Sequence, residues 1–126
     1  MLSTYEVGKK LVELCKQGKN QEAIDTLYAP NIVSIEAMSM PGMPARHDGL
    51  VAVKAAKKAF YDNTTIHSSS AEGPWPHGDR FIVKFSIDMT AKAGPMANQR
   101  MAMQEAALFT VKNGLITQEE FFYGGC

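Results

Sequence analysis

The sequence predicts an α+β fold in which three N-terminal helices pack on a strongly curved, mostly antiparallel sheet. Apolar residues recur at helical spacing in three segments of the first 61 residues. From residue 65 onward, apolar and polar residues alternate with the period of two that is typical of half-buried strands. Helices that are separated from an antiparallel sheet define the α+β class. Long strands covered by helices on one apolar face should curl into a half-barrel with an internal pocket, open at one end.

The first two helices form a hairpin that is bounded by capping and breaking residues. Ser3 or Thr4 caps the first helix, and Gly18 ends it. Asn20 is expected to cap a short second helix. Pro30 closes that helix, because the residue before a proline avoids the α conformation.

A short strand and a loop lead from this hairpin to the third helix. The β-branched segment 31–38 predicts a strand, and the Pro- and Gly-rich segment after it predicts a loop. Asp48 is expected to cap a helix over 49–61. Its apolar side is formed by Val51, Ala55, Ala59 and either Val53 or Phe60.

Four strands in a meander complete the chain. Asn113-Gly114 is the strongest hairpin signal, because both residues tolerate the positive φ of a type I′ turn. His77-Gly78-Asp79 predicts a second turn. The expected strands cover 65–75, 80–91, 98–112 and 115–123.

The bulk composition indicates one domain over 1–126, with 124–126 as a loose tail. Thirteen basic and 13 acidic residues give a net charge of zero. This balance argues against a nucleic-acid partner and against binding to a membrane. The first residues form no apolar signal segment, and no apolar run is long enough to span a bilayer. We therefore expect a cytoplasmic protein.

The sequence contains no pattern of a metal or cofactor site. Cys15 lies in a helical segment and Cys126 is the last residue, and neither stands near clustered ligands. The histidines His47, His67 and His77 form no pair at ligand spacing. We expect neither a metal nor a cofactor.

The main functional clue is Glu105, which interrupts the apolar face of the segment 98–112. Alternation places Glu105 on that face, between Met103 and Ala107. A carboxylate there is costly unless it is paired, protonated or facing a cavity. The sequence therefore predicts a pocket that Glu105 enters, or a structural partner for its carboxyl group.

Glu36 is the second candidate acid. It shares a strand face with Ile32 and Ser34. If Glu36 and Glu105 line one cavity, their repulsion and burial should raise at least one pKa. One carboxyl group could then act as a base and the other as a proton donor. The alternative is that each is held by an arginine or a tyrosine.

Other residues are expected near the pocket with a less specific role. Adaptable methionines could make a permissive apolar lining, although such residues more often belong to a core. His67 shares a strand face with Ser69, and Trp75 could stack on a flat ligand or cap the barrel. The predicted ligand-binding residues are Met38, His67, Trp75, Met89, Met103 and Phe122.

The last strand is apolar on both faces. Glu119 and Glu120 are adjacent, so they point to opposite sides. One face is expected to lie in an interface between two copies of the chain, formed by the outer face of the sheet. The alternative is that one of these glutamates is a third acid of the pocket, and the pattern does not say which.

Three segments together resemble the nuclear transport factor two-like superfamily, and within it the SnoaL-like branch. They are Leu27-Tyr28-Ala29-Pro30-Asn31, His47-Asp48-Gly49, and Val111 to Ile116 followed by Glu119 to Tyr123. The resemblance implies a cone-shaped α+β barrel with a deep pocket, often in a homodimer. It also implies a choice among cyclases, isomerases, dehydratases, hydrolases and non-catalytic binding modules.

The resemblance assigns some roles and removes others. The ketosteroid isomerase pattern implies that Glu36 holds the position of a general base. The positions that would supply the oxyanion hole are near Leu11 and Ala107, whose side chains donate no hydrogen bond.

Two functions follow from these observations. The first is a cofactor-independent isomerase or cyclase that acts on an apolar carbonyl compound through Glu105 and Glu36. The second is a non-catalytic module that binds a small apolar molecule or stabilises a dimer.

Overall fold

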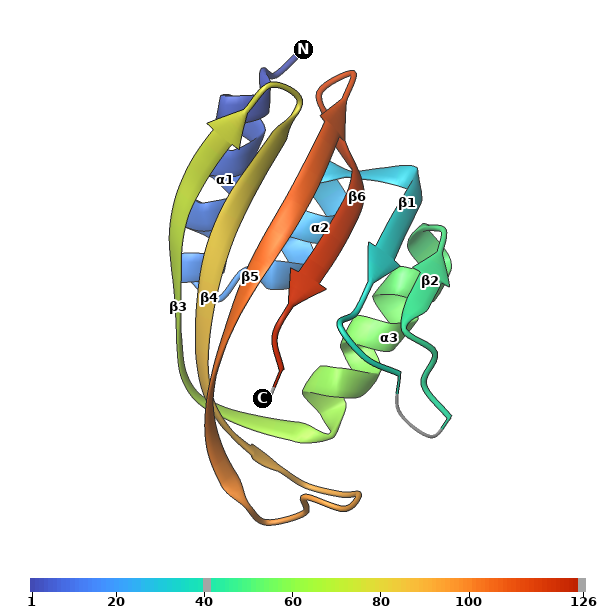
Figure 1. Cartoon of the computed structure of the whole chain (residues 1–126), viewed down its shortest axis with the longest axis vertical. Coiled ribbons are helices and arrows are strands. Elements are labelled where there is room, and N and C mark those ends of the chain that lie inside the picture. Colours follow the sequence, from blue (N-terminus) through green and yellow to red (C-terminus); the bar gives the residue numbers. More distant parts are fainter. Residues whose placement is uncertain (40–41, 125–126) are drawn as a thin grey trace.

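The computed structural model describes residues 1–39 and 42–124. Residues 125 and 126, which include Cys126 and most of the expected tail, lie outside this range. The elements in chain order are α1 (Thr4–Lys16), α2 (Asn20–Leu27), β1 (Tyr28–Ile35), β2 (Arg46–Asp48), α3 (Leu50–Asp62), β3 (Thr64–His77), β4 (Arg80–Ala91), β5 (Arg100–Lys112) and β6 (Leu115–Phe122). The predicted α+β fold, with three helices on a curved sheet, is confirmed (Figure 1).

The six strands form one sheet in the order β2-β1-β6-β5-β4-β3. Strands β3 to β6 form the predicted antiparallel meander. Strand β1 then joins the free edge of β6 in the parallel direction, which places Ser34 beside Glu119. The C-terminal ends of β1 and β6 therefore lie at the same end of the sheet.

One face of the sheet carries the hydrophobic core. Helices α1 and α2 cover this inner face, behind the sheet in Figure 1. The rings of Phe81 and Phe109 stack there at 4.9 Å between centroids, and both are fully buried. Helix α1 lies very close to the sheet, since a Cβ atom on Gly8 would come within 2.7 Å of Pro74 Cβ. The alternation of β5 is also confirmed, because Ala107, Phe109 and Val111 are buried on this face.

The ends of two elements differ from the expected ones. Ser3, one of the two predicted caps, caps α1, and it exchanges reciprocal hydrogen bonds with Glu6. Asn20 lies inside α2, and its side chain makes no capping hydrogen bond. Strand β1 begins at Tyr28, three residues before the expected start, because this residue pairs with Ile116 of β6.

The expected start of α3 was wrong, and of its expected apolar side only Val53, one of the two alternatives, is buried. Asp48 belongs to the short strand β2, where its carboxylate pairs with the guanidinium of Arg46 at 3.0 Å. The N-cap is Gly49, whose φ of 89° favours glycine. The helix buries Val53 and leaves Val51 85% exposed. Because residues four apart share a helix face, Lys57 lies on the same inward-facing side of α3 as Val53.

The helices are short. Within the described residues, none is both long and apolar enough to cross a membrane.

Candidate functional site

A cavity of about 290 Å³ lies between the helices and the inner face of the sheet. All three helices and strands β1 and β3 to β6 contribute to its lining, which is mostly apolar. Lys57 and Glu105 are its charged lining residues within the described part of the chain. The aromatic lining residues are Tyr28, Phe60, Tyr61, Phe85, Phe109 and Phe121.

Glu105 enters this cavity from β5. It pairs in register with Phe85 of β4, and the inward-facing Ala107 follows it on the same strand. Within the described residues, no hydrogen bond or ion pair holds its carboxyl group. Burial and, next, the charge of Glu36 raise the pKa of Glu105 from its ordinary value of 4.5 to about 7. The charge of Lys57 opposes this rise.

This raised pKa predicts how the Glu105→Gln variant changes stability with pH. The folded chain holds the proton more tightly than the unfolded chain, so the stability that this site contributes is full below pH 4.5 and is lost as pH rises through about 7. Gln cannot ionise. We expect equal stability at about pH 4, and a variant more stable by about 1–3 kcal/mol at about pH 8. Urea denaturation at both pH values measures this, with the exposed Glu13→Gln as control. A variant that is less stable at the higher pH would contradict the assignment.

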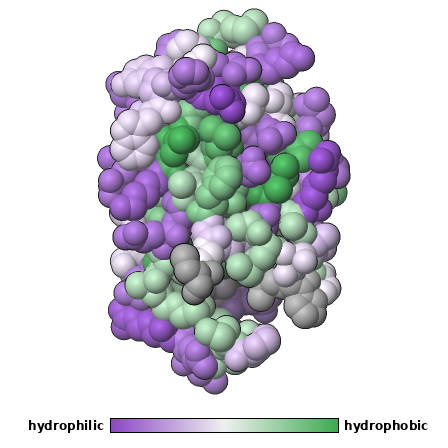
Figure 2. Space-filling view, viewed as in Figure 1, coloured by the Kyte–Doolittle hydropathy of each residue, from purple (hydrophilic) through white to green (hydrophobic). Residues whose placement is uncertain are grey.

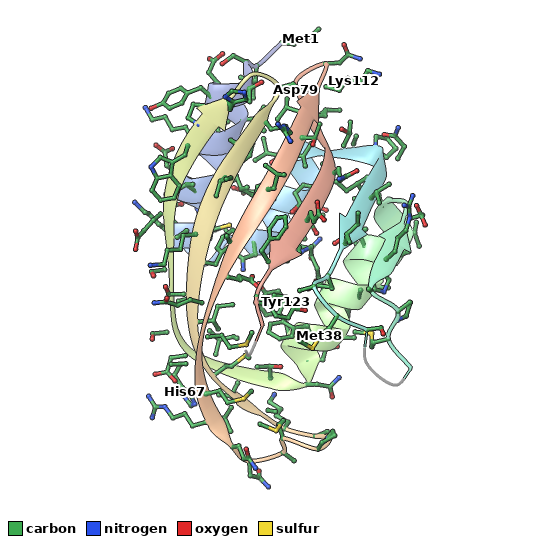
Figure 3. The ribbon with its side chains drawn as sticks, in the orientation of Figure 1. Met1, Met38, His67, Asp79, Lys112 and Tyr123 are labelled. Carbon is green, nitrogen blue, oxygen red and sulfur yellow. The ribbon has the colours of Figure 1, made fainter. Side chains whose placement is uncertain are left out.

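Glu36 lies just beyond the end of β1 and does not line the cavity wall. Its carboxylate accepts a hydrogen bond of 2.9 Å from the hydroxyl of Tyr123. Burial and this hydrogen bond raise the pKa of Tyr123. Tyr123 follows β6 near the centre of the molecule (Figure 3). Glu36 thus has the tyrosine partner that the structural alternative requires, while its charge still acts on Glu105.

Glu119 is the third interior acid, and it is fully buried. The hydroxyl of Tyr28 donates to its Oε1. The hydroxyl of Ser34 donates to its Oε2 at 2.7 Å, and Lys57 Nζ lies 2.9 Å from the same oxygen. These three donors satisfy a carboxylate that has no access to water. The face of β6 that carries Glu119 is therefore the inner face.

Sequence reasoning missed the three donors to Glu119. Lys57 was overlooked because lysine is rarely buried, although it lies one helical turn after Val53. Ser34 and Tyr28 depend on the parallel pairing of β1 with β6. That pairing joins residues 85 and 91 positions apart, and no local pattern reports it.

Glu119 also controls the protonation of its partners. Burial by itself would lower the pKa of Lys57, but the charge of Glu119 and the contact with it raise the pKa above its ordinary value. Lys57 therefore stays an ammonium group, and it also lies 5.0 Å from the centre of the Phe121 ring. Burial and the same carboxylate raise the pKa of Tyr28, so its phenol stays protonated.

The structure places His67 away from the cavity. A register shift between Ile66 and Ser68 breaks the alternation of β3, so Ile66 and Ala71 both line the cavity. His67 is exposed, and its Nε2 lies 2.7 Å from Thr90 Oγ1. In Figure 3 it stands near the lower edge of the sheet, apart from Tyr123.

The other predicted ligand-binding residues also lie outside the cavity lining. Trp75 and Phe122 are 53% and 50% exposed, and Met38 is equally exposed beyond β1. Trp75 pairs in register with Ile82, which points outward between the buried Phe81 and Val83. Met103 borders a second hollow on the sheet. Met89 is buried but is not part of the cavity lining.

The described residues show no metal centre. Within the described residues, no group of three or more His, Cys, Asp or Glu side chains is arranged to hold a metal ion.

Comparison with known proteins assigns the family. A family model described as a SnoaL-like domain matches residues 2–123. The chain belongs to the SnoaL-like family. The resemblance inferred from the sequence is thereby confirmed. A comparison with curated proteins found no match.

Solved structures extend this assignment. A proposed SnoaL-like polyketide cyclase of Mesorhizobium loti is 38% identical to this SnoaL-like protein, with a TM-score of 0.89, and covers 97% of this chain and 100% of its own. A proposed polyketide cyclase of Pseudomonas putida is 13% identical, with a TM-score of 0.72 over 98% of this chain and 93% of its own. A proposed isomerase of Bacillus subtilis is 16% identical, with a TM-score of 0.72, and the match covers 94% of this chain and 84% of its own. The last two likenesses show the fold alone.

Proposed function

We propose that this SnoaL-like protein is a cofactor-independent isomerase or cyclase that moves a proton on an apolar carbonyl compound. The observation that carries the proposal is the Glu105 carboxyl group, which enters an apolar cavity and has a pKa of about 7. A general base is most effective when its pKa lies near the working pH. The Mesorhizobium loti protein, proposed to be a polyketide cyclase, is similar over the whole chain and supports the same class of reaction.

The reaction begins with removal of a proton from the carbon next to the carbonyl group. Glu105 accepts this proton, the C–H electrons form a C=C bond, and the carbonyl oxygen becomes an enolate oxygen. In an isomerase Glu105 returns the proton to another carbon. In a cyclase the enolate carbon attacks a second carbonyl group, and the oxygen of that group receives the C=O electrons and takes the proton from Glu105. Glu36 acts through its charge, which sustains the raised pKa of Glu105.

Hydrogen exchange tests this function without knowledge of the natural substrate. A panel of apolar ketones and 1,3-diketones is incubated with the protein in deuterated water, and loss of the α-proton signal is followed by NMR. Exchange that is faster with wild-type protein than with Glu105→Gln supports the proposal. Equal exchange with both proteins across the panel contradicts it. A ligand that copurifies in native mass spectrometry, together with no exchange, would favour the non-catalytic binding module.

We also propose that two copies associate through the outer face of the sheet. Figure 2 shows apolar side chains gathered on the face that is turned away from α1 and α2. Trp75, Ile82 and Leu108 form a row across β3, β4 and β5 in register, and two of them are more than 40% exposed. Exposed apolar rows of this kind are typical of interfaces.

A charge placed in this row should separate the two copies. We expect wild-type protein to sediment as a dimer and Leu108→Lys as a monomer, because an unpaired ammonium in an apolar interface is costly. Sedimentation velocity measures this, with Lys112→Gln at the exposed end of β5 as control. A wild-type monomer, or a dimeric Leu108→Lys variant, would refute the proposed interface.

A further inference from the structure

We infer that Lys57 is the anion-binding group of the cavity, and that the ligand is an enolisable carbonyl compound or phenol whose oxygen lies against the Lys57 ammonium. The inference rests on the proposed function, because it names the group that stabilises the negative charge that forms on the substrate oxygen when Glu105 removes a proton. Its experiment measures binding rather than turnover, so the role of Lys57 and the proposed function can fail separately.

The first support is the position of Lys57. It lines the cavity from α3, while Glu105 lines it from β5, so a ligand between helix and sheet can reach both. It is the one cationic side chain among the described residues of the lining. Its side chain is 24% exposed, whereas that of Glu119 is fully buried.

The second support is its remaining hydrogen-bonding capacity. An ammonium group has three N–H donors. Glu119 takes one of them at 2.9 Å, and Phe121 offers a ring face that accepts no conventional hydrogen bond. Within the described residues, Lys57 Nζ has no other polar partner. Donors therefore remain for a ligand oxygen. Tyr28, which also reaches the cavity, has its hydroxyl proton committed to Glu119.

The third support is that the cation is held in place before a ligand arrives. Glu119 is fixed by Tyr28 and Ser34 as well as by Lys57, and these residues come from α3 and two neighbouring strands. A fixed charge in a site of low polarity stabilises developing charge without reorganising. An ion pair that served only to anchor α3 would not need to open into the cavity.

The charges also balance during the reaction. Before proton transfer the negative charge resides on Glu105, and afterwards it resides on the enolate oxygen, while Glu105 is neutral. The net charge of the cavity is unchanged, and Lys57 faces a negative charge in both states. Other lining residues, such as Tyr61 and Ser69, can donate a hydrogen bond, but Lys57 is the one described lining residue that also carries a positive charge.

Binding of substituted phenols tests this assignment, because a phenolate resembles an enolate in shape and charge. The measurements use the Glu105→Gln protein, whose neutral amide imitates the protonated Glu105 that follows proton transfer. We expect affinity to rise as the phenol becomes more acidic, and the bound ligand to show the absorption band of the phenolate. The methyl ethers of the same phenols should bind weakly and equally.

The decisive variant removes both charges of the ion pair, by adding Lys57→Met and Glu119→Gln to the Glu105→Gln protein. The amide that Glu119→Gln introduces can still accept a hydrogen bond from one of the two hydroxyls through its oxygen, and its NH2 group can donate to the oxygen of the other. We expect phenolate affinity to fall on the order of 10- to 100-fold, the value of a hydrogen bond to a charged group. Affinity for the methyl ethers should be unchanged, which separates loss of the cation from loss of the cavity.

Phenolates bound equally with and without Lys57 would overturn the inference, and so would a Glu105→Gln protein that binds no phenol. If the triple variant does not fold, the phenol series on Glu105→Gln decides, because an affinity independent of phenol acidity rules out a cationic partner. If wild-type protein and Glu105→Gln exchange the α-proton at the same rate, the proposed function is contradicted, but the phenolate result still stands.

Discussion

The Glu105→Gln variant is expected to lose turnover by about 100- to 10,000-fold, the usual contribution of a positioned general base. Gln keeps the size of the side chain but cannot accept the substrate proton. The loss should appear in kcat, because the base acts on bound substrate. The hydrogen-exchange rate of the best ketone in the panel measures it. The exposed Glu13→Gln should retain full activity.

The pH dependence provides a second check on the same residue. Glu105 must be ionised to accept a proton, and its pKa is about 7. The rate should therefore rise as pH increases through about 7 and become constant above it. Glu105→Gln should lose this dependence together with its activity. A rate that is already constant from about pH 5.5 upward would indicate a base with an ordinary carboxyl pKa, and hence a group other than Glu105.

The Glu119→Ala variant is expected to be less stable by about 3–5 kcal/mol, because removing one partner of a buried ion pair leaves the other uncompensated. Lys57 would lose its counterion, and the hydroxyls of Tyr28 and Ser34 would lose their acceptor. For a chain of this size, such a loss lowers the melting temperature by roughly 10–20 °C. Thermal and urea unfolding measure the change. Glu120→Gln, on the opposite face of β6, should unfold close to wild type.

A double substitution distinguishes charge from packing at the same position. Lys57→Met combined with Glu119→Gln replaces the ion pair by neutral groups of similar shape, which is often neutral for stability. We expect this protein to recover most of the stability that Glu119→Ala loses. If it is as unstable as Glu119→Ala, packing rather than the ion pair holds α3 on the sheet.

Much of the fold could be predicted because its signals are local. The alternation of β5 and the Asn113-Gly114 turn fix two strands and their register without reference to the rest of the chain. The reciprocal cap of Ser3 and Glu6 likewise marks the start of α1. Strand β2 was missed because it has three residues, too few for a periodic pattern.

The candidate site could be predicted only in part, for the same reason. Glu105 was found because one charge breaks an otherwise apolar face within its own strand. The Lys57–Glu119 pair joins a helix to a strand through tertiary packing alone. A register shift in β3, which composition does not reveal, turned His67 outward. Whether an inward acid is unpaired or paired depends on contacts of this long-range kind.

The central claim is that Glu105 titrates near neutral pH inside the cavity, and its own carboxyl carbon reports this directly. Protein labelled with carbon-13 at the glutamate side chains is titrated by NMR, and the Glu105 signal is assigned by its absence from Glu105→Gln. We predict a midpoint at about 7 in the folded protein. A midpoint near the ordinary value of 4.5 would contradict this claim, because Glu105 would then be an ordinary solvated carboxylate and a poor base.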